Sequence, residues 1–123
     1  MVDIESKRLQ LRELNVADVT ESYVSWLNNP EINQYLESRF FKHEFKDVKR
    51  FVEEINNDKY NILLGIFIKK SMKHIGNIKI GPINLHHKTA YIGLLIGDNS
   101  EWHNGYATES IQAVTKFCFN KLN

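Results

Sequence analysis

The ten residues EWHNGYATES, at positions 101–110, join two segments of opposite character. Before them runs the apolar stretch AYIGLLIG, residues 90–97, and after them IQAVTKFCF, residues 111–119, has apolar side chains at helical spacing. The ten residues therefore connect a predicted strand to a predicted helix. Such a connection is either a plain turn or a backbone cradle for the phosphate groups of a ligand.

The start of a helix is suited to binding an anion, because its first backbone N–H groups lack partners and its dipole favours negative charge. Gly105 allows a close approach to the backbone, and Asn104 tolerates left-handed backbone angles. Ala107 is small for the same reason, and Thr108 offers a hydroxyl donor. Taken alone the stretch favours a turn, because Asn-Gly is a common turn dipeptide. The P-loop and dinucleotide-binding patterns are both absent from it.

The first half of the chain predicts one strand and two helices. Residues 8–12 alternate polar and apolar side chains, as a half-buried strand does. In the first helix Trp26 shares an apolar face with its neighbours, Asn15 and Asp18 suit the start, and Pro30 marks the end. The second helix carries one apolar stripe, formed by Val48, Phe51, Val52 and Ile55.

The second half predicts three strands, at residues 62–68, 75–83 and 90–97, followed by a helix from residue 107 to about residue 121. The first two strands form a hairpin. The third is apolar on both faces, which is typical of a central strand covered on each side. The order β-α-α-β-β-β-α indicates a single α+β domain over residues 1–123, with an antiparallel meander.

Composition narrows the class of protein. The 123 residues fit one domain, and 42% hydrophobic with 25% charged residues is ordinary for a soluble globular chain. A formal charge of +1 argues against nucleic acid or an anionic membrane as a partner. The single cysteine, Cys118, excludes an internal disulfide and is expected to be a core thiol. No signal core and no apolar run of about 18 residues is present, so we expect a cytoplasmic protein.

Three stretches resemble the GNAT family of acetyltransferases. Residues 102–107, WHNGYA, are similar to the family's acetyl-CoA pyrophosphate loop, Arg/Gln-x-x-Gly-x-Gly/Ala, with tryptophan at the first position. Residues 26–36, WLNNPEINQYL, and the opening LQLREL, residues 9–14, resemble the RimJ/RimL-like branch of ribosomal-protein N-acetyltransferases. The resemblance covers nearly the whole chain in one order. It implies a mixed, mainly antiparallel GNAT-like sheet flanked by helices.

The resemblance implies that acetyl-CoA is the acetyl donor and that the acetyl group passes directly to a primary amine. The pantetheine arm would pair with backbone around Leu94, Leu95 and Ile96, and an N–H near Ile96 would contact the developing oxyanion. The pyrophosphate would meet the loop, residues Trp102, His103, Asn104, Gly105, Tyr106, Ala107 and Thr108. The acceptor would be a small-molecule or peptide amine.

The general base is open at this stage. Many members of the branch have a glutamate near the start of the strand at 90–97, where this chain has Tyr91. His86 and His87, after the preceding strand, are alternatives with a suitable intrinsic pKa, although exposed turn histidines are the more common case. His74 and His103 are expected at the surface or in loops, as is His43. No spacing such as HExxH suggests a metal site.

The resemblance assigns much of the acceptor site to the segment between the first two helices. Glu37 would orient an ammonium group, and Arg39 would pair with an acidic acceptor. The resemblance also assigns Tyr35 and Phe40 to the acceptor site. For both aromatic residues, a place in the core is the alternative.

The family fold continues after the last predicted helix with strands and a helix that form the other wall of the cofactor cleft, whereas this sequence stops at Asn123. The strand at 90–97 would then have an unpaired apolar edge, so we expect a homodimer through that edge. Two other hypotheses stay open. One is a non-catalytic acyl-CoA binding domain or a fragment of an acetyltransferase, and the other is a small α+β interaction domain without a cofactor.

Overall fold

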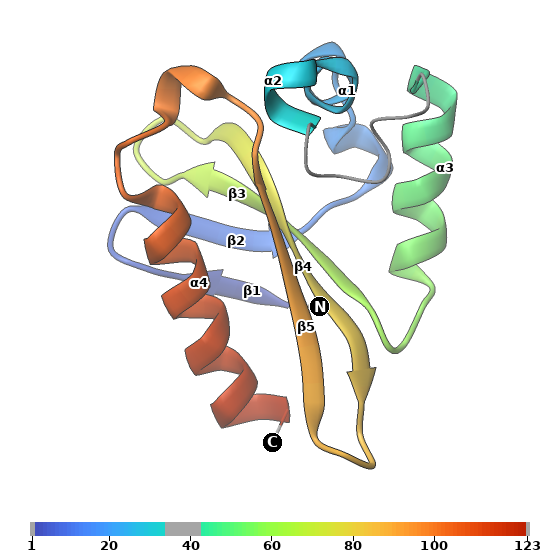
Figure 1. Cartoon of the computed structure of the whole chain (residues 1–123), viewed down its shortest axis with the longest axis vertical. Coiled ribbons are helices and arrows are strands. Elements are labelled where there is room, and N and C mark those ends of the chain that lie inside the picture. The colour runs from blue at the N-terminus through green and yellow to red at the C-terminus, as the bar shows by residue number, and fades with distance from the viewer. Residues whose placement is uncertain (1, 34–42, 123) are drawn as a thin grey trace.

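The computed structural model describes residues 2–33 and 43–122 (Figure 1). Its centre is a five-stranded antiparallel sheet in the order β1-β2-β3-β4-β5. The strands are β1 (Asp3–Glu5), β2 (Leu9–Glu13), β3 (Ile62–Ile68), β4 (Lys73–Asn84) and β5 (Thr89–Ile96). The helices are α1 (Glu21–Asn28), α2 (Pro30–Asn33), α3 (Phe45–Asn56) and α4 (Tyr106–Phe117), with short 3₁₀ turns η1 (Val16–Asp18) and η3 (Asn99–Glu101) and a final π-helical turn η4 (Cys118–Leu122).

Two apolar cores lie on the two faces of the sheet, which the strand period of two produces. Leu63 and Phe67 of β3 pack with α1 and α3, whereas Leu64 and Ile66 pack on the other side with Val114 of α4. β3 is therefore covered on both faces, as its continuous apolar sequence requires. Figure 1 shows α4 on one side of the sheet and α1, α2 and α3 gathered on the other.

The N-terminal region differs from the prediction in two places. Strand β1 has only three residues and was not predicted; it pairs Ile4 with Leu11 of β2. Asn15 and Asp18 do form a capping box, but around η1, while α1 starts at Glu21 beneath the cap of Thr20. The predicted cap was therefore assigned to the wrong element. The first helix ends before Pro30, as predicted, and that residue begins α2.

Two expectations of burial are wrong. Within the described residues β5 is an edge strand, hydrogen-bonded to β4 alone, and the side chain of Tyr91 is 73% exposed. Phe51, placed in the buried stripe of the second helix, is 45% exposed on α3. An apolar run shows which side chains of a strand can be buried. It does not show whether other elements cover both faces of that strand. No helix in the described ranges is both long and apolar enough to cross a membrane.

Candidate functional site

A cavity of about 540 Å³ lies where the end of β5 meets the loop before α4. Residues from α2, β5 and the loop line it together: Glu31, Ile32, Leu94, Leu95, Ile96, Glu101, Trp102, His103, Gly105, Tyr106 and Ala107. The fold thus brings the predicted pantetheine strand and most of the predicted pyrophosphate loop to one cavity. Asn104 and Thr108 lie outside its lining, and Thr108 lines a neighbouring groove with Gly105 and Arg8.

The backbone of β5 presents alternate residues to its open edge. Gly97 N donates to Ile75 O over 2.8 Å, so this pair occupies a hydrogen-bonded position of the antiparallel ladder. The register then makes Gly76–Ile96 and Ile78–Leu94 non-hydrogen-bonded pairs. The N–H and C=O groups of Leu94 and Ile96 consequently point away from β4, whereas those of Leu95 point toward it.

Trp102 ties the loop to the end of this strand. Its indole Nε1 donates to the backbone oxygen of Ile96 over 2.9 Å, which is the acceptor that the register turns outward. The unusual first residue of the loop motif therefore has a structural role. It satisfies the last edge carbonyl of β5 and holds the loop against the strand.

The loop presents a row of backbone donors. Glu109 N is the first amide of α4 to reach a carbonyl, that of Gly105, and in the described part of the chain the N–H groups of residues 103–108 have no acceptor. Gly105 has φ +79° and precedes the helix, and His103 also has positive φ, at 69°. These are the left-handed conformations that a glycine favours and other residues seldom adopt. A helix start with free amides fits an anionic group such as a pyrophosphate.

Two groups at the site were missed by sequence reasoning. Glu31 of α2 lines the cavity and accepts from Asn99 Nδ2 over 3.3 Å. Arg8 and Glu109 form an ion pair of 2.7 Å that fastens the first turn of α4 to the chain before β2. Burial opposes ionisation of Glu109, but hydrogen bonds from Ser6 and Arg8 outweigh it and lower the pKa of the carboxyl. Partners about a hundred residues apart leave no signal in local spacing.

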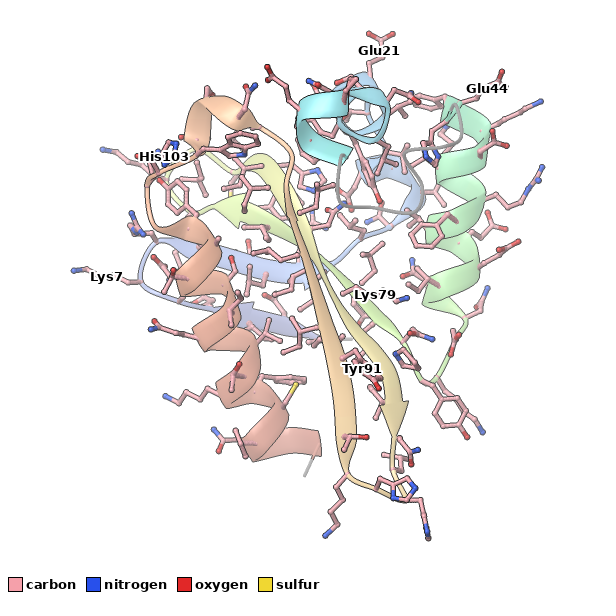
Figure 2. The ribbon with its side chains drawn as sticks, in the orientation of Figure 1. Lys7, Glu21, Glu44, Lys79, Tyr91 and His103 are labelled. Atoms are coloured by element: carbon pink, nitrogen blue, oxygen red, sulfur yellow. The ribbon has the colours of Figure 1, made fainter. Side chains whose placement is uncertain are left out.

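The candidate bases lie away from this cavity. Tyr91 and His103 are well separated along the molecule in Figure 2. Tyr91, His86 and His87 line a different groove, beside the turn between β4 and β5. The predicted acceptor residues Tyr35, Glu37, Arg39 and Phe40 fall outside the described residues.

His74 is not a surface histidine, contrary to the prediction. It lies in β4 with its ring 4.7 Å from that of Phe67 and 5.0 Å from that of Trp26, and its Nε2 is 2.8 Å from Asn77 Oδ1. Burial lowers the pKa of His74, although the contact with Asn77 acts in the opposite direction. The imidazole is therefore neutral at pH 7, in a core where Trp26 is buried as predicted.

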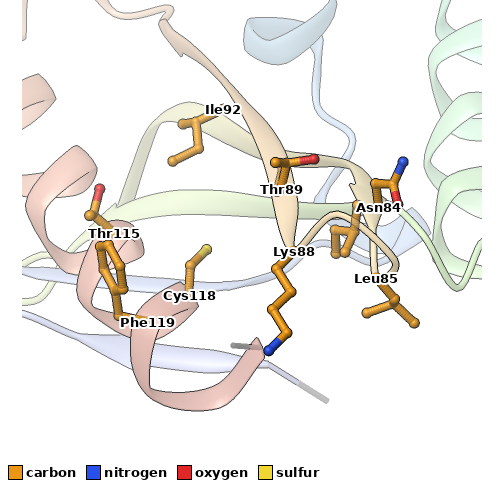
Figure 3. Close-up of a pocket in the computed structure, with 10 residues that line it drawn as sticks. Asn84, Leu85, Lys88, Thr89, Ile92, Thr115, Cys118 and Phe119 are labelled. Atoms are coloured by element: carbon orange, nitrogen blue, oxygen red, sulfur yellow. The ribbon is translucent and has the colours of Figure 1, made fainter.

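A smaller cavity of about 160 Å³ lies between the β4–β5 turn and the end of α4 (Figure 3). Ile92, Thr115 and Cys118 are among its lining residues, with the exposed ring of Phe119 at its rim. Partial burial raises the pKa of the Cys118 thiol, which disfavours the reactive thiolate. The cysteine is half-buried against the core, close to the predicted setting.

Residues 8–123 match the family model described as an acetyltransferase (GNAT) domain. The chain belongs to the GNAT acetyltransferase family, whose acetyl donor is acetyl-CoA. A comparison with curated proteins finds no match.

Solved structures share this fold at low sequence identity. A GNAT acetyltransferase from Bacillus anthracis has a TM-score of 0.81 and 21% identity, over 98% of this chain and 68% of that one. Spermidine N-acetyltransferase from Vibrio cholerae, in complex with CoA and spermine, has a TM-score of 0.83 and 20% identity over 96% and 68%. An enzyme from Salmonella typhimurium that modifies the N-terminal serine of ribosomal protein L7/L12 has a TM-score of 0.79 and 22% identity over 98% and 70%.

Proposed function

We propose that this chain binds acetyl-CoA along the open edge of β5 and the loop at 103–108, for direct transfer of the acetyl group to a primary amine. One observation carries the proposal. The loop amides without acceptors and the outward-facing backbone groups of the β5 edge lie at the same cavity. A plain turn does not need this combination. Acetyl-CoA, when bound, supplies the activated acetyl thioester.

The residues present fit the two parts of the cofactor that the family resemblance assigns to them. The N–H groups of residues 103–108 would hold the pyrophosphate, and Gly105 leaves room, since a Cβ there meets only Arg8 Nη2, at 3.4 Å. The outward backbone of Leu94 would pair with an amide of the pantetheine arm. Leu95 would contribute its side chain to the cavity wall, because its backbone points toward β4.

The N–H of Ile96 is suited to stabilise an oxyanion. It points to the open edge, and the carbonyl of the same residue is held by Trp102. A fixed backbone donor costs little reorganisation when negative charge develops on the thioester oxygen. The attacking amine must be neutral, and the leaving thiolate must receive a proton. Tyr91, His86 and His87 stay predictions for the base, at a distance from this cavity.

A positively charged acceptor fits the cavity wall. Glu31 and Glu101 both line it, Glu101 with Lys73 as an ion-pair partner at 3.4 Å, and carboxylates attract the ammonium form in which amines arrive at neutral pH. The relatives support an amine as well: one is a spermidine N-acetyltransferase and another modifies an N-terminal serine. The acceptor contacts assigned to Tyr35, Glu37, Arg39 and Phe40 remain part of the proposal.

A second candidate is acyl-CoA binding without turnover, which the placement of the predicted bases away from the cavity favours. An amine panel of spermidine, an amino sugar and a peptide with a free N-terminus separates the two functions. Release of CoA that depends on one amine supports transfer. Binding of acetyl-CoA with no CoA release from any amine supports the second candidate.

A further inference from the structure

We infer that Arg8 is a positioning residue for the phosphate loop, and that Glu109, which accepts a hydrogen bond from Ser6, in turn holds Arg8. This inference rests on the proposed acetyl-CoA site. Arg8 immediately precedes β2, about a hundred residues from the loop in sequence. Its role is to orient a backbone N–H rather than to supply charge to the ligand.

One guanidinium spans the loop. Nε of Arg8 donates to Glu109 Oε1 over 2.7 Å, Nη1 donates to the carbonyl oxygen of Asn104 over 2.9 Å, and the group lies 4.4 Å from the ring centre of Tyr106. The contacts thus reach both sides of Gly105. The planar fork of arginine serves two acceptors at once, which a lysine ammonium on its flexible stem does not reproduce.

The Glu109 carboxylate is itself held firmly. Besides the guanidinium it accepts from the backbone N–H of Arg8 over 2.8 Å and from the hydroxyl of Ser6 over 2.5 Å. Its side chain is only 16% exposed, against 42% for that of Arg8. The carboxylate compensates the arginine charge, so little net positive charge is left for a ligand.

The contact with Asn104 decides where the Gly105 amide points. The peptide bond between them is trans and planar, so the N–H of Gly105 is directed opposite to the Asn104 carbonyl. Arg8 holds that carbonyl, and the N–H of Gly105 therefore points away from Arg8, where it has no acceptor among the described residues. Loss of Arg8 frees this peptide unit to rotate, which misaligns one donor of the row.

β2 supplies a matched control. Arg12 also makes charge-assisted hydrogen bonds to a carboxylate, that of Asp18, at 2.9 Å each, and its guanidinium lies 4.2 Å from the ring centre of Phe67. The two pairs are alike in chemistry and carry similar burial of the carboxylate, 16% and 15% exposed. Only the pair of Arg8 contacts the loop.

The test measures CoA affinity by calorimetry for the wild-type chain and for Arg8→Gln, Arg8→Lys and Arg12→Gln. We expect both Arg8 variants to weaken CoA binding about tenfold, the loss of a charge-assisted hydrogen bond. Arg12→Gln should leave the CoA affinity within about twofold of the wild-type value, although it should destabilise the fold about as much as Arg8→Gln does. The ¹H–¹⁵N signal of Gly105 without ligand should move in the Arg8 variants and stay in Arg12→Gln.

The outcomes separate this inference from the proposed function. A wild-type chain that does not bind CoA overturns both. Wild-type binding with full affinity in Arg8→Gln, or equal loss in Arg12→Gln, overturns the positioning role and leaves the cofactor site intact. Rescue by Arg8→Lys would show that charge is sufficient, and would also overturn it. If Arg8→Gln does not fold, Glu109→Gln weakens the support of the guanidinium while Arg8 is retained, and unchanged CoA affinity in that variant would overturn the inference.

Discussion

The indole nitrogen of Trp102 bonds the outward-facing carbonyl of Ile96 over 2.9 Å, and this contact joins the loop to the strand edge that together form the candidate site. The donor comes from the motif position where the family pattern has arginine or glutamine. A hydrophobic ring with one N–H serves here because the nearby acceptor is a backbone oxygen. The loop and the outward-facing backbone of Ile96 are therefore linked through this hydrogen bond.

Replacing Trp102 with phenylalanine should weaken acetyl-CoA binding. The ring is kept in part, but the hydrogen bond to Ile96 is lost, which costs about 1 kcal/mol, or about fivefold in affinity. Calorimetric titration of the folded variant measures the change. An unchanged dissociation constant would mean that the indole contact does not organise the site.

Gly105 variants should separate backbone strain from ligand repulsion. Gly105→Ala imposes positive φ on a residue with a Cβ, at a cost of roughly 1–2 kcal/mol in stability. Gly105→Glu imposes the same strain and adds a carboxylate beside the proposed pyrophosphate position. We expect both variants to fold and only Gly105→Glu to lose binding completely. Equal affinities in the two variants would contradict a phosphate site at this loop.

Gly76 should be intolerant of any side chain, because a Cβ there would stand 2.2 Å from the backbone oxygen of Leu95. Backbone atoms of β5 cannot swing aside as a flexible side chain can. We expect Gly76→Ala to lower the free energy of unfolding by about 1–3 kcal/mol in urea. Gly93→Ala, whose Cβ meets nothing within 4 Å, is the control and should be nearly neutral. Comparable losses in both would refute the close approach of β4 and β5.

His74 should make stability depend on pH near neutrality. The unfolded chain binds a proton on this residue near pH 6.5, whereas burial lowers the pKa in the folded state. The contribution of neutral His74 to the stability of the fold is thus complete above pH 6.5, and it declines as the pH falls through the folded-state pKa. The lowered pKa values of Asp18, Asp98 and Glu109 act in a more acidic range.

Urea unfolding at pH 7.5 and at pH 5.5 tests the expectation for this histidine. The wild-type chain should lose stability at the lower pH, and His74→Gln should show a smaller difference while being less stable throughout. His86→Gln, which changes an exposed turn residue, should keep the wild-type difference. If His74→Gln keeps the wild-type pH dependence of stability, another titrating group causes that dependence.

The open edge of β5 should promote self-association of the 123-residue chain. Outward backbone groups and the 39% exposed side chain of Ile92 favour pairing with a second copy. Sedimentation velocity should show a concentration-dependent dimer that Ile92→Lys weakens. Ile111→Lys, on α4 and 42% exposed, is the control. A monodisperse wild-type monomer at high concentration would contradict this expectation.

The sequence predicted the order of the main elements because strand and helix periods are local. The hairpin of β3 and β4, the last helix and the loop all follow from alternation, turn residues and apolar spacing. Strand β1 was not predicted, because a three-residue strand with a single apolar residue shows no periodicity. The partial burial of His74 was not predicted because its neighbours, Trp26 and Phe67, come from other elements. The ion pair between Arg8 and Glu109 depends on tertiary packing, so no local sequence pattern predicts it.

In the proposed function, the loop at 103–108 binds the pyrophosphate of acetyl-CoA. Calorimetric titration of the wild-type chain with acetyl-CoA, repeated with Gly105→Glu, tests it most directly. We expect saturable binding at one site per chain in the wild type, with none in the folded variant. No heat and no thermal stabilisation in the wild type, or full affinity in Gly105→Glu, would contradict it.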